Sequence, residues 1–135
     1  MALRFVPAAT SLALALALAA CSAPPTPEQL PFFEPGVEFT VNQVGTGCTA
    51  DGAYRAKVSW EVPPSMSSKI EVQVGDDRAG IFARSNDSTG SEETGDWVRD
   101  GTLFVMVDRD SKMVLAALKA GPGNCTAPAM ETVGD

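Results

Sequence analysis

Acidic side chains are the groups of this sequence that could do chemistry, and they gather in two short segments. One follows residue 84 and the other brackets a turn near residue 109; they contain Asp87, Glu92, Glu93, Asp96, Asp108 and Asp110. Carboxylates bind Ca²⁺ through hard oxygen ligands, and paired carboxylates hydrolyse glycosidic bonds. Asp108 and Asp110 are the weak metal candidates, because the glycine and final glutamate of an EF-hand loop do not follow them. We favour the alternative, acidic solvated loops that keep the protein soluble.

The residue types that most enzymes use are missing from the chain. It contains no histidine, which removes the usual general base near neutral pH and the commonest metal ligand. Neither Ser-x-x-Lys nor Gly-x-Ser-x-Gly occurs, and there is no glycine-rich phosphate loop. A sugar cleft needs aromatic walls, and the chain has only two Trp and one Tyr. We therefore expect no catalytic residue, no metal and no cofactor, and predict that the protein is not an enzyme.

Length and charge narrow the class of protein further. The 135 residues suit one domain, and a hydrophobic content of 44% is enough for a buried core. The chain carries 10 Lys and Arg against 17 Asp and Glu, a formal net charge of −7, and has no basic cluster. Such a chain is a poor partner for nucleic acid or for anionic lipid headgroups.

Residues 1–20 have the pattern of an export signal. Arg4 supplies a short positive start, and no charged residue follows between Phe5 and Ala20. The continuous apolar run over 12–18 is too short for a membrane-spanning helix, and no stop-transfer pattern follows it. We therefore expect these residues to be a signal peptide.

The end of this signal, Leu18-Ala19-Ala20-Cys21, resembles the lipobox of bacterial lipoproteins. The resemblance implies that the signal is cleaved before Cys21 and that this cysteine is acylated, with palmitate among its acyl groups. The acyl chains would then anchor the protein in a membrane. In that family, an aspartate directly after the cysteine signals retention, and here that position is Ser22. The resemblance therefore implies sorting to the outer membrane, with the protein facing the periplasm of the cell envelope. The alternative is an ordinary signal peptide cut after Ala20, with Cys21 as an incidental thiol.

Residues 21–36 form a proline-rich segment that we expect to act as a tether. Five of the fifteen positions from 22 to 36 are proline, which favours extended polyproline geometry. At about 3.1 Å per residue, such a spacer reaches on the order of 45 Å. Leu30, Phe32 and Phe33 are exceptions to a plain spacer, and either the near end of the domain or the membrane interface could take them up.

From Val37 onward, apolar and polar residues alternate with a period of two, which is typical of half-buried strands. The clearest runs cover 37–41, 54–62 and 70–74, and four further candidates cover 81–84, 97–98, 103–107 and 113–119. Turn-forming residues separate these runs. We predict an all-β fold without a substantial helix: an antiparallel β-sandwich of about seven strands over 37–125, followed by a flexible tail at 126–135.

Two segments resemble fibronectin type III domains, which are immunoglobulin-like sandwiches. Val58-Ser59-Trp60-Glu61-Val62-Pro63-Pro64 is similar to the B strand of that family, which carries a core Trp ahead of Pro. The segment 100–107 is similar to the family's E–F corner and F strand, with Phe104 where the family usually has Tyr. The resemblance implies the fibronectin type III topology; another sandwich with the same strand count is the alternative.

Cys48 and Cys125 are the two cysteines that acylation of Cys21 would leave. An exported chain is expected to pair them, because the periplasm is oxidising. Seven alternating antiparallel strands would place the end of the first and of the last at the same pole, away from the tether. We therefore predict a structural disulfide there; free or redox-active thiols are the alternative, although no Cys-x-x-Cys is present.

The runs 103–107 and 113–118 are apolar at nearly every position. One face of each strand must fill the core, and the alternation does not decide which. The other face would then form an apolar stripe that binds a partner, with Phe104, Met106, Val114, Ala116 and Leu118 as the candidate patch. The alternative is that small residues and the tail cover the stripe.

Taken together, these features predict a lipid-anchored envelope protein that acts as a non-catalytic binding or accessory module. Its partner would be an envelope protein or a glycan. The alternative is a Ca²⁺-dependent glycan binder, or a carboxylate-dependent hydrolase, that uses the acidic loops.

Overall fold

The computed structural model describes residues 24–126, and this part of the chain contains eight β-strands and no helix. The strands are β1 (Phe32–Phe33), β2 (Glu38–Gln43), β3 (Ala56–Glu61), β4 (Ile70–Val74), β5 (Gly80–Ser85), β6 (Thr89–Glu93), β7 (Leu103–Asp108) and β8 (Val114–Lys119). No helix that could cross a membrane is therefore found between residues 24 and 126. The predicted signal peptide at 1–20, Cys21 and all but the first residue of the predicted tail lie outside the described residues.

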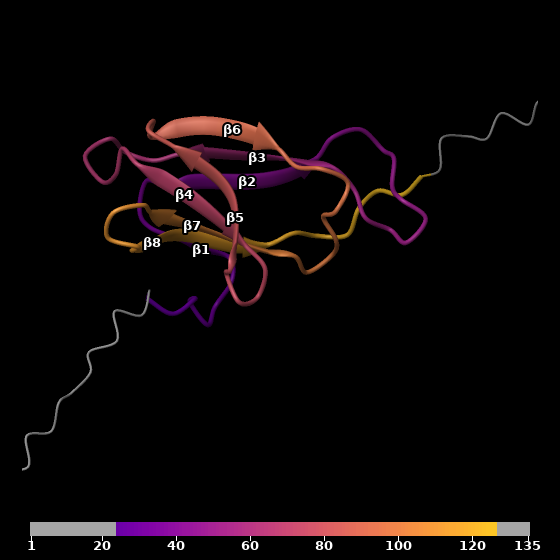
Figure 1. Ribbon diagram of the computed structural model, residues 1–135, viewed down its shortest axis with the longest axis horizontal. Coiled ribbons are helices and arrows are strands. Elements are labelled where there is room, and N and C mark those ends of the chain that lie inside the picture. Colours follow the sequence, from indigo (N-terminus) through magenta and orange to yellow (C-terminus); the bar gives the residue numbers. More distant parts are fainter. Residues whose placement is uncertain (1–23, 127–135) are drawn as a thin grey trace, which may run out of the picture.

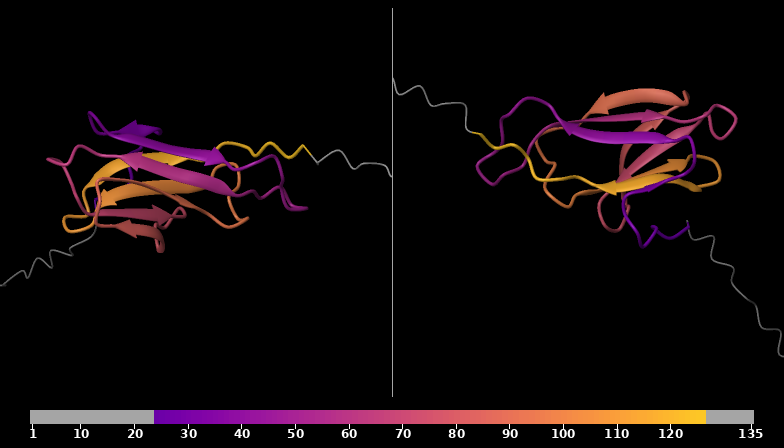
Figure 2. Two further views of the ribbon diagram at one scale, coloured as in Figure 1. Left: turned by 90° about the horizontal axis from the view of Figure 1, so that it is seen from above. Right: turned by 180° about the vertical axis from the view of Figure 1, so that it is seen from behind.

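The strands form two facing antiparallel sheets (Figure 1). One sheet has the order β1-β8-β7-β4-β5 and the other the order β2-β3-β6. The two layers are also visible from behind in Figure 2, where loops gather at the two ends of the sandwich. The prediction of an all-β antiparallel sandwich is confirmed.

Three elements differ from the sequence prediction. Strand β1 lies inside the predicted tether, and β6 forms where the sequence predicts a loop. Residues 97–98 are not a strand, because Val98 makes only an isolated bridge with Tyr54. Strand β6 has no apolar residue, so its sequence carries no alternation, and its ladder with β3 forms at an edge of the sheet.

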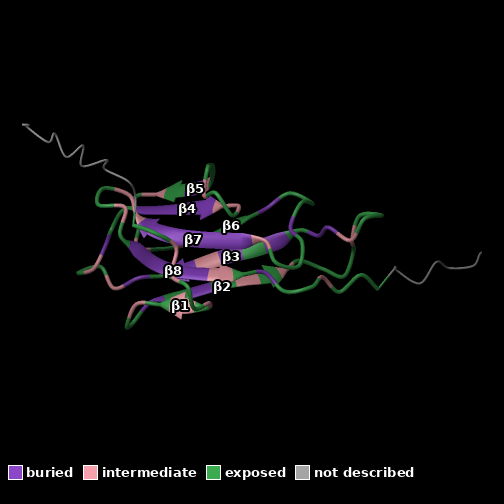
Figure 3. Cartoon of the chain, turned by 90° about the horizontal axis from the view of Figure 1, so that it is seen from below, coloured by how far each residue is buried: buried purple, intermediate pink, exposed green. Residues whose placement is uncertain are grey.

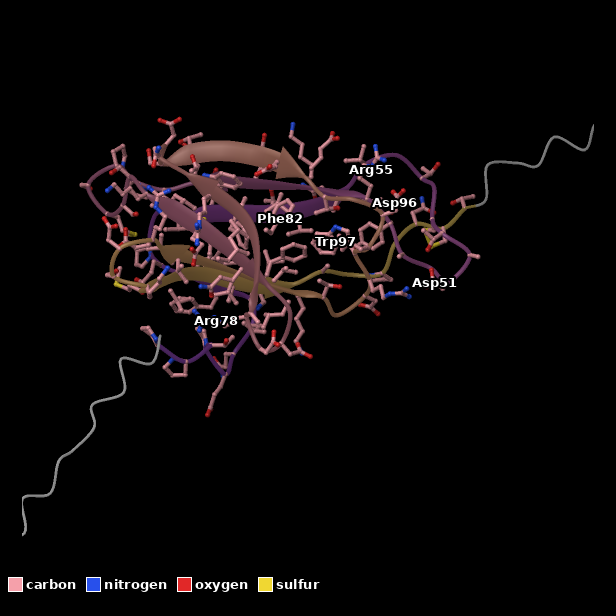
Figure 4. The ribbon with its side chains drawn as sticks, viewed as in Figure 1. Asp51, Arg55, Arg78, Phe82, Asp96 and Trp97 are labelled. Carbon is pink, nitrogen blue, oxygen red and sulfur yellow. A yellow bond between two sulfur atoms is a disulfide. The ribbon has the colours of Figure 1, made fainter. Side chains whose placement is uncertain are left out.

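The core lies between the two sheets and settles the register of β7. Phe104 and Met106 are fully buried in the main hydrophobic cluster, together with Trp60 of β3. Phe104, which stands where the fibronectin type III family usually has Tyr, therefore faces the core. Phe82, which is partly buried, and Trp97, which is 40% exposed, pack against Phe104 with ring centroids 6.2 and 6.0 Å from it, so this aromatic group extends from the core to the surface (Figure 4).

A disulfide joins Cys48 to Cys125, as the sequence predicts, with 5.1 Å between their Cα atoms. Around it, the Gln43 side chain donates to Asn124 O at 3.2 Å, and Asn124 N–H donates to Gln43 Oε1 at 2.5 Å. The bridge therefore fixes the C-terminal segment of the described chain to the loop that follows β2.

Candidate functional site

The predicted interaction patch is not a surface. Phe104, Met106 and Ala116 are fully buried between the sheets, and Leu118 packs partly buried against the same cluster. Val114 is 6% exposed and belongs to a second hydrophobic cluster. The prediction of an exposed stripe formed by these residues is wrong, because both faces of β7 and β8 are covered. Figure 3 shows these two strands and β4 buried along most of their length.

The outer face of the five-stranded sheet is covered by residues 24–33, which we call the strap. Its Leu30 and Phe32 pack against the second cluster, which consists of Leu103, Val105, Val107, Val114 and Ala117. Phe32 and Phe33 form β1 and pair with Ala117 and Ala116 of β8. Glu34 N–H then donates to Leu115 O at 2.9 Å. The hydrophobic strap residues therefore lie on the domain, the first of the two placements open from the sequence.

This placement corrects the predicted tether. The sequence predicts a free spacer over 21–36 and a domain that begins at Val37. Residues 24–33 instead lie along the outer face of the sheet, at the underside of the molecule in Figure 1. The folded unit therefore begins well before Val37.

Arg78 holds the upstream end of the strap. Its Nη1 donates to the backbone oxygen of Pro24 at 2.5 Å, and its Nε donates to Gln73 Oε1 at 2.8 Å. Arg78 lies in the turn between β4 and β5, with φ at 56°, below the sheets in Figure 4. A shallow pocket here is lined by Pro24, Pro25, Thr26, Gln73, Asp77 and Arg78. The guanidinium thus joins the strap backbone to the side chains of β4.

Glu71 is a buried carboxylate on the same outer face. Its side chain is 1% exposed and accepts hydrogen bonds from Gln73 Nε2 at 2.9 Å, Arg84 Nε at 3.1 Å and Lys112 Nζ at 3.1 Å. Burial by itself raises the pKa of Glu71, but these three donors outweigh burial and hold the pKa below its ordinary value. The carboxylate is therefore ionised and fully occupied by neighbouring donors.

Polar contacts thus run without a break from this carboxylate to the strap. Gln73 donates to Glu71 and accepts from Arg78, and Arg78 donates to Pro24 O. Such a network fixes the positions of its members, although Arg78 Nη2 is buried without a hydrogen-bond partner among residues 24–126. The network therefore acts as a structural contact between the sheet and the strap.

The two weak metal candidates make different contacts and do not converge. Asp108 accepts from Ser67 Oγ at 2.6 Å and from Ser111 N–H at 2.8 Å, whereas Asp110 lies 3.6 Å from Lys69 Nζ. Burial raises the pKa of Asp108, but these donors outweigh it and the pKa is lowered. Within residues 24–126, no group of three or more His, Cys, Asp or Glu side chains could hold a metal ion.

The other acidic residues lie in β6 and in the segments before and after it, so the acidic stretch that the sequence predicts as a loop contains a strand. Glu92 and Glu93 lie in the strand and pair with Val58 and Lys57 of β3. Asp96, beyond the strand, lies 3.6 Å from Arg55 Nε (Figure 4). Asp87 belongs to the turn before β6. An extended row of this kind gives no pair of carboxylates facing a common cleft.

Two further hollows lie on the surface of the described part of the chain, among others. One lies on the outer face of the three-stranded sheet, around Thr40, Lys57, Ser59 and Ser91. The other runs between β2 and β8 and includes Leu30, Phe33, Phe39, Val41 and Leu118. The sequence signals neither of them, because each joins residues of separate strands.

Comparisons of the chain with protein-family models, with curated proteins and with solved structures give no significant match. Its function is therefore inferred from its own residues.

Proposed function

We propose that the chain is a bacterial lipoprotein. It is exported, cut before Cys21 and acylated there, and its β-sandwich serves as a non-catalytic binding or accessory module. It sits in the cell envelope, on the periplasmic face of the outer membrane, where an envelope protein or a glycan is its partner.

The observation that carries this proposal is the use of the three cysteines. Cys48 and Cys125 form the disulfide, which leaves Cys21 as the remaining cysteine, at the end of a lipobox. Disulfides form and persist in oxidising compartments, so the bridge supports export. Acylation supports stable membrane binding, since more than one acyl chain provides an anchor without any basic patch.

The finer topology belongs to the same proposal. We assign β2 to β8 to the A, B, C, C′, E, F and G strands of a fibronectin type III-like domain. The sheet order β2-β3-β6 facing β8-β7-β4-β5 supports this assignment, as does Trp60 in the core of β3. In immunoglobulin constant domains the fourth strand belongs to the same sheet as strands A and B. Here the fourth strand of the assignment, β5, pairs instead with β4 in the other sheet.

Mass spectrometry of the membrane fraction tests the anchor. The mature N-terminus is expected to be Cys21 with added acyl mass, and Cys21→Ser is expected to release the protein from the membrane fraction. As a matched control, a variant with Cys48→Ser and Cys125→Ser keeps the acyl mass. An unmodified N-terminus in a soluble fraction would contradict the proposal.

Calcium titration by calorimetry tests the alternative, a Ca²⁺-dependent activity of the acidic segments. We expect no binding heat, because Asp108 and Asp110 make separate contacts. Tight binding that is lost in Asp108→Asn with Asp110→Asn would favour the alternative.

A further inference from the structure

We propose that the outer face of the five-stranded sheet, where Arg78 holds the strap, faces the lipid bilayer and lies close to it. The inference rests on the proposed acylation of Cys21 and states where the domain sits once that anchor is in the membrane.

The argument begins with the reach of the chain. Pro24 follows Cys21 by three residues, and three residues span at most about 11 Å. The backbone oxygen of Pro24 accepts a hydrogen bond from Arg78 Nη1 at 2.5 Å, so this point of the chain belongs to the surface of the domain. An acylated Cys21 therefore stays within about 11 Å of the surface around Arg78.

Three separate contacts keep the strap from acting as a free spacer. Arg78 binds its first described residue, and Leu30 and Phe32 cover the second hydrophobic cluster. Strand β1 then pairs with β8. While these contacts hold, the spacer of about 45 Å that the proline-rich composition suggests is not available to lift the domain away from the membrane.

Two exposed loops differ in their distance from the anchor. The turn between β4 and β5 carries Arg78 and the exposed Asp76, next to the start of the strap. The loop with Ala50 and Asp51 lies at one end of the long axis, beside the disulfide and away from Arg78 (Figure 4). Membrane attachment at Cys21 therefore brings the turn close to lipid and leaves the disulfide end distant.

Energy transfer from the domain to labelled lipids tests this arrangement. The acylated full-length protein is placed in phosphatidylethanolamine–phosphatidylglycerol vesicles whose headgroups carry an acceptor dye. A fluorescent noncanonical residue replaces either Asp76 or Ala50, both exposed, which leaves the disulfide intact. We expect stronger transfer from position 76 than from position 50. Equal transfer, or stronger transfer from position 50, overturns the proposal.

Release of the strap provides the second measurement. Arg78→Gly removes the contact with Pro24 and suits the positive φ of 56° at this position. The first strap residue packed on the second hydrophobic cluster is Leu30, nine residues after Cys21, so release of the segment before it raises the reach to about 30 Å. The difference between the two donors should shrink. If the difference in energy transfer between positions 76 and 50 is unchanged, Arg78 does not keep the domain close to the membrane.

Arg99→Ala is the matched control, because it removes an arginine that pairs with Asp51 at the distant end. It should keep the full difference between the donors. The acyl mass of each preparation is measured first. Loss of that mass contradicts the proposed anchor, whereas equal transfer from an acylated protein contradicts only the orientation.

Discussion

Glu71 shows how much a single polar side chain depends on distant parts of the chain. In the sequence it is one of the polar residues that alternate with Ile70, Val72 and Val74, so it is predicted to face outward, and it does. Its burial could not be predicted, because the groups that pack on and around it come from other elements, among them Arg84 and Lys112. Alternation shows which way a side chain points; it does not show what covers that face.

Replacing Glu71 with Gln should destabilise the protein at pH 7. The change removes the charge that accepts from Arg84 and Lys112, and because both cations are partly exposed, we expect a loss of about 1–3 kcal/mol. The pKa of Glu71 is lowered from its ordinary 4.5 in the folded state, so its stabilising effect is complete above about pH 4.5 and is lost as the pH falls through the folded pKa.

Urea unfolding at several pH values checks this prediction. The difference between the original protein and Glu71→Gln should be largest near neutral pH and should shrink below about pH 4.5. Glu92→Gln, at an exposed position of β6, is the control and should change stability little. A difference that grows in acid would contradict the assigned direction of the pKa shift.

At the scale of elements, the strands with an alternating or a continuous apolar pattern were predictable, and β1 and β6, which have neither pattern, were not. β2, β3 and β4 follow the period of two, and the long apolar run of β7 has both faces buried. β6 is polar throughout, and β1 is two residues long within a proline-rich segment. Both edge strands are defined by their partners, β3 and β8, so local sequence carries little of the signal.

Gly90 is the residue that lets β6 approach β3. A Cβ atom at this position would lie 2.8 Å from Cζ2 of Trp60, which is 5% exposed and fixed in the core. Gly90→Ala is therefore expected to cost about 1–3 kcal/mol through overpacking, measured by thermal or urea unfolding. Gly47→Ala, where a Cβ would meet no atom within 4 Å, is the control. Equal effects of the two changes would argue against this packing.

At the scale of the whole molecule, the disulfide links points 77 residues apart in the sequence. Its pairing was predictable, because export and the antiparallel strand count place both cysteines at one end. The covered outer face was not predictable in the same way. The sequence indicates a second apolar face on β7 and β8 and leaves two alternatives for it, a partner-binding stripe or a cover of small residues and the tail, whereas Leu30 and Phe32 cover it.

Removal of the bridge should weaken the entire sandwich. Changing Cys48 and Cys125 to Ala is expected to lower the free energy of unfolding by about 2–4 kcal/mol, because the unfolded chain has more conformational entropy without the bridge. The urea midpoint of the variant should match that of the original protein under reducing conditions. Identical midpoints for the oxidised and reduced original protein would contradict a stabilising role.

The strap also bears on how the protein can be produced. A recombinant version trimmed to begin at Val37 would lack Leu30 and Phe32, and water would then reach Leu103, Val105 and Val107 on the central strand. A bare patch of this kind drives molecules to associate with one another. A well-behaved soluble version should therefore keep Leu30 and Phe32, even though the segment around them resembles a linker.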